Sequence, residues 1–101
     1  MQAINTPEKQ LEHLRKQIHS QDRELLLVLK KRMQLASKIG TLKAKNDWDI
    51  AQNEYWEKTV EARSKLAQKL GLNEVLVKQL FSKIHSESKK AQQEIITNRK
   101  K

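Results

Sequence analysis

Two cations interrupt the apolar face of the stretch LVLKKRMQLASKIGTLKAK, which covers residues 27–45. Arg32 and Lys43 are eleven residues apart, so on a helix they lie within about 20° of one face and roughly 16 Å apart along the axis. Side chains of this length can reach inward to the two ends of one small ligand. The alternative is that they extend along the helix surface and pair with nearby carboxylates.

Arg15 carries the same chemistry but lies farther away along the chain. It precedes Arg32 by 17 residues, or about 25 Å of helix, so it cannot reach the same ligand from its own chain. An antiparallel helix of a partner chain could deliver it. A surface position, or an ion pair with Asp22 or a glutamate, is the alternative for Arg15 as it is for Arg32.

Ser88 and Gln92 interrupt a second apolar stripe near the C-terminus. They are four residues apart and therefore stack on one helical face. Buried, they would need hydrogen-bond partners; exposed, they would belong to a frayed helix end. Together with the cations they suggest a polar pocket for a small anion, lined by hydrogen-bond donors.

Several other kinds of chemistry have little support in the sequence. The chain has no Cys, and His13, His19 and His85 are scattered in positions that favour the surface. No ligand pair at helical spacing, nucleophile beside a base or glycine-rich phosphate loop is present. We therefore expect no metal and no cofactor, which leaves reactions that need only binding, orientation and charge stabilisation.

Three helices should position these residues. Thr6-Pro7-Glu8 is a helix start signal, and the apolar pattern from Leu11 continues for about 38 residues to the KNDWD segment. A second helix should begin near Asp49 and end before Gly71, a residue suited to the position after a helix. Asn73 can cap a third helix. We expect one domain over residues 1–96 and a basic, disordered tail over 97–101.

The length and composition favour an all-α oligomer. The 101 residues contain two Gly and one Pro, and 4% are aromatic. The first helix alone would be roughly 57 Å long, too long to bury its apolar seam within one small chain. We expect an intertwined helical homodimer with this helix paired against its copy, and the alternative is a monomeric three-helix hairpin with a projecting end.

The motifs resemble those of the AroQ-class, all-helical chorismate mutases. The resemblance runs from about Leu11 to Gln92 without a gap. It rests on the Leu-Arg pair at 14–15, the Leu-rich run before Arg32, Lys43, the Gly-Leu pair at 71–72 and the SxxxQ motif of Ser88 and Gln92. It implies an intertwined dimer with two equivalent sites that convert chorismate to prephenate in phenylalanine and tyrosine biosynthesis.

The resemblance also implies a role for each matching residue. Arg15 of the partner chain and Arg32 would bind the two carboxylates of chorismate. Lys43 and Gln92 would donate hydrogen bonds to the ether oxygen, which gathers negative charge as its bond breaks. Ser88 would contact a carboxylate.

The start of the second helix departs from the family pattern. An acidic residue and an Arg-Glu pair are usual there, and the corresponding residues are Gln52, Tyr55 and Trp56. Trp56 cannot accept the hydrogen bond that the family's Glu takes from the ring hydroxyl of chorismate. Glu54 is two positions away, about 200° around the helix. Gln52 could take over the hydroxyl contact.

Two other classes of function stay open. The altered helix 2 segment motivates a related enzyme on another substrate, namely an isochorismate pyruvate-lyase, an aminodeoxychorismate mutase or a low-activity mutase domain that needs a partner. The net charge of +9 motivates a basic helical dimer that binds nucleic acid. Our main expectation is a soluble, cytoplasmic enzyme that binds neither nucleic acid nor membrane. Docking to another shikimate-pathway enzyme is possible, and nothing in the sequence tests it.

Overall fold

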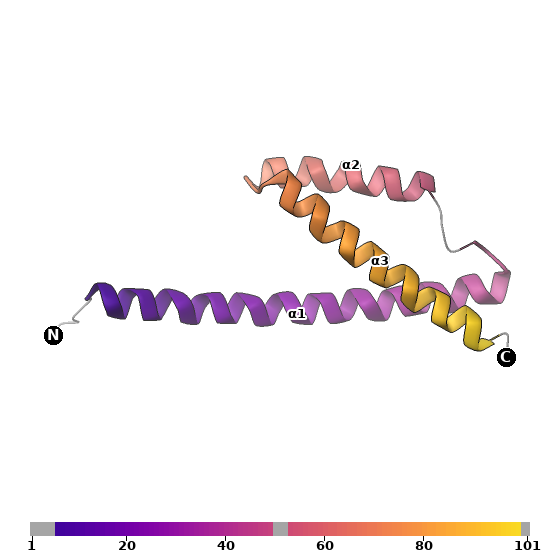
Figure 1. Ribbon diagram of the computed structural model, residues 1–101, viewed down its shortest axis with the longest axis horizontal. Coiled ribbons are helices and arrows are strands. Elements are labelled where there is room, and N and C mark those ends of the chain that lie inside the picture. The colour runs from indigo at the N-terminus through magenta and orange to yellow at the C-terminus, as the bar shows by residue number, and fades with distance from the viewer. Residues whose placement is uncertain (1–5, 50–52, 100–101) are drawn as a thin grey trace. The chain divides into compact units, whose positions relative to one another are not determined.

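The protein is described here by a computed structural model, which covers residues 6–49 and 53–99. Within these residues the secondary structure consists of three α-helices and no strands: α1 (Pro7–Asn46), α2 (Asn53–Lys69) and α3 (Glu74–Arg99) (Figure 1). The all-α fold with one long and two shorter helices is therefore confirmed. The chain divides within α1 into two units, residues 1–32 and 33–101, and each is described separately.

The helix ends confirm the local signals in the sequence. At the start of α1, the backbone N–H of Lys9 donates to Oγ1 of Thr6 over 3.2 Å. At the start of α3, Val75 and Leu76 donate to Oδ1 of Asn73 over 2.8 and 3.1 Å. Both side chains satisfy backbone donors that a helix N-terminus otherwise leaves without partners.

Left-handed residues close α1 and α2. Gly71 has φ of 70°, and the N–H of Leu72 donates to the carbonyl of Ala67 over 2.9 Å. This is the hydrogen bond of a Schellman turn, for which glycine is best suited. The end of α1 repeats it with an aspartate: Asp47 has φ of 53°, and the N–H of Trp48 donates to the carbonyl of Lys43 over 2.9 Å.

Two predicted boundaries differ from the structure. Asp49 lies outside the helices and the described part of α2 begins at Asn53, so the second helix does not begin at Asp49 itself. The residues between the two lie outside the described part of the chain. α3 continues through Thr97 and Asn98 to Arg99, within the segment that we expected to be a tail. Those three residues carry no helix-breaking Gly or Pro, so nothing in the local sequence ends the helix earlier.

The first unit contains the N-terminal part of α1. Its exposed large apolar residues recur at helical spacing, and their exposed fractions run from 47% for Leu11 to 65% for Leu26. An exposed ion pair joins Lys16 and Glu12 over 3.7 Å and contributes at most a few tenths of a kcal/mol. The helix therefore presents an apolar face that the chain itself leaves uncovered in the described residues.

In the second unit, α2 and α3 form an antiparallel hairpin (Figure 1). Its contacts form a ladder away from the Gly71 turn. Gln68 donates to Glu74, the guanidinium of Arg63 lies 5.5 Å from the Phe81 ring centre, and Trp56 stacks on His85. The buried residues Ala67 and Val77 lie at the turn end of the same hairpin.

The C-terminal part of α3 packs against the end of α1 at Gly40 (Figure 1). A Cβ atom on Gly40 would lie 2.9 Å from Cα of Gln92, closer than real Cβ atoms approach a backbone. Gly40 thus allows a helix–helix contact that a larger residue would push apart. α3 therefore contacts α2 with its first half and α1 with its second half.

Candidate functional site

The contact between α1 and α3 buries two polar side chains. Lys43 is 9% exposed and Gln92 is 7% exposed, and Lys43 Nζ donates a hydrogen bond to Gln92 Oε1 over 3.1 Å. Gly40 lies one turn before Lys43, so the close approach of the helix backbones brings the two side chains together. With its Oε1 facing Lys43, the amide of Gln92 has its Nε2 protons on the other side.

Burial changes the electrostatics of Lys43. Removing the ammonium group from water disfavours its charged form, which lowers the pKa of Lys43 from its usual value of 10.5. The hydrogen bond to Gln92 compensates part of this loss of hydration. A desolvated cation acts on a nearby developing negative charge more strongly than one in water.

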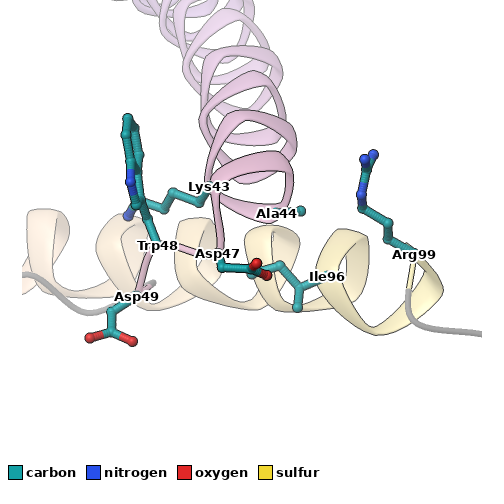
Figure 2. A pocket seen from close by; sticks show the side chains of 7 residues that line it. All are labelled: Lys43, Ala44, Asp47, Trp48, Asp49, Ile96 and Arg99. Atoms are coloured by element: carbon teal, nitrogen blue, oxygen red, sulfur yellow. The ribbon is translucent and has the colours of Figure 1, made fainter.

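A pocket of about 410 Å³ opens beside Lys43 at the C-terminal end of α1. Figure 2 shows the Lys43 side chain extending toward the Trp48 ring, while Asp47 lies beside Ile96 of α3. The other lining residues are Ala44, Asp49 and Arg99. This volume is in the range of small-molecule sites, and the pocket brings Lys43 within reach of solvent from the side of the helix end.

Trp56 and His85 form a second feature on the same unit. Their ring centroids are 3.8 Å apart with an interplanar angle of 11°, an almost parallel stack between α2 and α3. His85, Ser88 and Gln92 are separated by three and four residues, so they follow one face of α3. Ser88 is half-buried on that face.

His85 was predicted to lie on the surface, and this prediction is wrong: the residue is half-buried. Desolvation lowers the pKa of His85 from 6.5, and the positive charges of Lys89 and Lys43 lower it further. Its imidazole is therefore neutral near pH 7, with one nitrogen able to accept a hydrogen bond.

The remaining predicted site residues are placed as follows. Tyr55 is 67% exposed, Gln52 lies outside the described residues, and so does the side chain of Glu54. Arg15 is exposed and Arg32 is half-buried, and both belong to the first unit. The structure thus brings Lys43 and Gln92 into contact and places Ser88 on the Gln92 face of α3. The roles of the two arginines stay predictions.

Sequence reasoning did not single out Gly40 or the Trp56–His85 stack. A glycine inside a long helical pattern is a signal for close backbone approach, and Gly40 could have been recognised by it. The stack has no local signal, since its two residues are on different helices. Among the described residues, no cluster of three His, Cys, Asp or Glu side chains could hold a metal ion, and no helix has the length and hydropathy of a membrane span.

Comparison with known proteins identifies the family of the chain. The family model described as chorismate mutase type II matches residues 14–93, which is most of the 101-residue chain. The matched region begins one residue before Arg15 and ends one residue after Gln92. No curated protein matches the chain. With the family match spanning all three helices, the chain belongs to the chorismate mutase type II family, the AroQ class.

Proposed function

We propose that the protein is a chorismate mutase, an isomerase that converts chorismate to prephenate in phenylalanine and tyrosine biosynthesis. The buried hydrogen bond between Lys43 and Gln92 is the observation that carries the proposal. It joins a desolvated cation and an amide, two donors of the kind that stabilise negative charge. Family membership supports the same reaction.

The reaction needs no group from the protein to form a covalent bond. In chorismate the ether C–O bond breaks while a new C–C bond forms in the same molecule, and no proton is lost or gained. The protein can therefore accelerate it by holding the reactive conformer and by stabilising the charge that gathers on the ether oxygen. Lys43 Nζ and Gln92 Nε2 are the donors that we assign to this oxygen.

The carboxylates of chorismate require cations at both ends of the site. We assign Arg32 to one carboxylate and Arg15 of a partner chain to the other, since guanidinium groups bind carboxylates through two parallel hydrogen bonds. Ser88, on the Gln92 face of α3, would donate to a carboxylate as well. No metal or cofactor takes part in this proposal.

A homodimer is part of the proposal. The hydrophobic core of the described residues consists of Ala36, Ala67 and Val77, while Leu, Ile and Val side chains of α1 are about half exposed. A second copy that packs against α1 would bury this surface, with each exposed leucine contributing on the order of 1 kcal/mol. The same pairing would supply Arg15 to the other chain. We place this dimer in the cytoplasm, apart from nucleic acid and membranes.

The test is a direct assay with matched variants. We expect the purified protein to consume the diene absorbance of chorismate and to yield prephenate, identified by NMR. Lys43→Ala and Gln92→Ala should each lower kcat/KM by about 10²–10³-fold, the usual effect of removing one donor to a developing oxyanion. Lys45→Ala and Gln93→Ala remove the same side chains from exposed neighbouring positions and should leave the rate within about twofold.

A folded, dimeric protein that does not turn over chorismate would refute the proposal. Turnover of isochorismate or of an amino analogue in the same assay would instead assign the chain to a different substrate. Trp56 motivates this second candidate, because it stands where the resemblance places the family's usual Glu.

A further inference from the structure

His85 is an ionisable side chain without an assigned role, on the face of α3 that also carries Ser88 and Gln92. Lys43 and the arginines are cations that only donate hydrogen bonds. The carbonyl oxygen of Gln92 already accepts from Lys43. Chorismate presents acceptors to these groups through its carboxylates and ether oxygen, but its ring hydroxyl is a donor that needs an acceptor of its own.

From this arrangement we infer that His85 is a substrate-binding residue whose imidazole nitrogen, fixed by the Trp56 stack, accepts the hydrogen bond of the substrate's ring hydroxyl. The inference rests on the proposed function and deepens it, because it names the residue that distinguishes hydroxylated substrates from others. It differs from the sequence-based expectation that Gln52 makes this contact.

The position of His85 supports the inference. It lies two turns before Gln92 on the same face of α3, and Lys43 is close enough for its charge to act on the imidazole. His85 is therefore near both residues that we assign to the ether oxygen. His85 and Gln92 share one face of α3, and Lys43 reaches Gln92 from α1, so we infer that one small ligand can contact all three side chains.

The stack fixes the ring without occupying its nitrogens. Trp56 contacts the flat face of the imidazole at 3.8 Å between centroids, and the nitrogens lie at the ring edge. Within residues 6–49 and 53–99 no hydrogen bond to either ring nitrogen of His85 is present. The edge is thus oriented by packing and available to a ligand, which lowers the entropy cost of binding.

The charges around His85 keep the acceptor form available. Lys43 from α1 and Lys89 from α3 both disfavour a proton on the imidazole. On α2, the residues one turn after Trp56 are Thr59 and Val60, which carry no charge. A protonated His85 would donate rather than accept, so the proposed contact is present near pH 7 and is lost as the pH falls through the lowered pKa of His85.

The experiment compares chorismate with its analogue that lacks the ring hydroxyl. The parent should prefer chorismate by about tenfold in kcat/KM, the effect of one hydrogen bond of about 1.4 kcal/mol. His85→Phe keeps an aromatic ring against Trp56 but removes the nitrogens, and should reduce this ratio to near one. His85→Gln, which restores an acceptor, should recover part of the ratio, and His13→Phe, a change of an exposed histidine, should leave it unchanged.

Two further readouts separate binding from packing. NMR of the histidine ring protons should give a pKa for His85 below 6.5 in the free protein. The decline of kcat/KM at acid pH in the parent should be absent in His85→Phe. Circular dichroism of the variant provides the check that its helices are intact.

Each outcome has a distinct meaning. A His85→Phe variant that is folded and keeps the parent's preference overturns the inference, and so does a preference that Gln52→Ala alone abolishes. If the parent itself turns over neither compound, the proposed function fails and the inference fails with it. Turnover by the parent therefore tests the proposed function. The ratio of kcat/KM between chorismate and its analogue in the variants tests the role of His85.

Discussion

Lys43 combines two requirements that usually conflict in proteins. A cation is useful for stabilising negative charge when it is desolvated, yet desolvation opposes its charged form. Here the ammonium group is buried and donates to Gln92 over 3.1 Å, and its pKa is lowered by burial. The donor role that we assign to Lys43 requires its protonated form, so the alkaline limit of activity reports how far burial lowers this pKa.

A pH profile tests this balance. We expect kcat/KM to fall on the alkaline side at a pH below 10.5, where the ammonium of Lys43 loses its proton. Lys43→Gln should lack this decline, whereas Lys45→Ala should retain it. A decline that is unchanged in Lys43→Gln would contradict the assignment.

The contribution of Lys43 to stability has the opposite sign in this range. Because its native pKa is lowered, the unfolded chain binds more protons between that pKa and 10.5, and the contribution to stability rises with pH there. Deprotonation of Lys43 should therefore lower the activity at alkaline pH without destabilising the fold. Circular dichroism across the profile distinguishes the two.

At the scale of elements, α3 is the helix that assembles the site. Its first half holds the hairpin with α2 through Phe81 and His85, and its second half reaches α1 at Gln92. The contact at Gly40 determines how closely α1 and α3 approach. The site therefore depends on one glycine that itself offers no chemical group.

Gly40→Ala should lower both stability and activity. In an exposed helix the change would stabilise by about 1 kcal/mol, but here the added methyl meets the backbone of Gln92 at 2.9 Å. Overpacking of this kind costs about 1–3 kcal/mol, and the displaced α3 would carry Gln92 away from Lys43. Chemical denaturation and kcat/KM measure the two effects.

Thr41→Ala, at the exposed neighbouring position, is the control for that variant and should keep the activity. A Gly40→Ala protein with higher stability and full activity would show that the two helices can separate without harm to the site.

The elements themselves could be predicted from local signals, and the contacts between them could not. Thr6, Gly71 and Asn73 determine helix ends through the backbone of their own neighbours, so the sequence is sufficient there. The Trp56–His85 stack depends on the register of two helices that a turn brings together. Lys43 and Gln92, 49 residues apart, could be paired beforehand by family resemblance, which supplies the tertiary information that periodicity lacks.

At the scale of the whole molecule, the distribution of apolar residues is the dominant feature. Ala36, Ala67 and Val77 are buried, a core too small to offset the entropy cost of ordering some 100 residues. Large side chains such as Leu14 and Ile18 are 55% and 58% exposed. In the proposed dimer, a second chain would cover this surface and supply much of the free energy of folding.

Self-association should depend on this face of α1. Ile18→Lys places a charge within it and should shift the protein from dimer to monomer, with loss of helicity and activity. Ser20→Lys adds the same charge about 200° around the helix and should remain dimeric. Light scattering after size-exclusion chromatography measures both, and a parent that is monomeric at micromolar concentration would contradict the proposed dimer.

Because α3 contacts both α2 and α1, the positions at which the chain tolerates an insertion or deletion are limited. Each residue of a helix turns the following side chains by about 100°. One residue inserted between Phe81 and His85 would preserve the hairpin contacts near the turn, yet it would turn His85, Ser88 and Gln92 away from their partners together. An insertion after Ile96 would leave all of these contacts in register. The site therefore depends on the number of residues between Phe81 and Gln92 as well as on their identity.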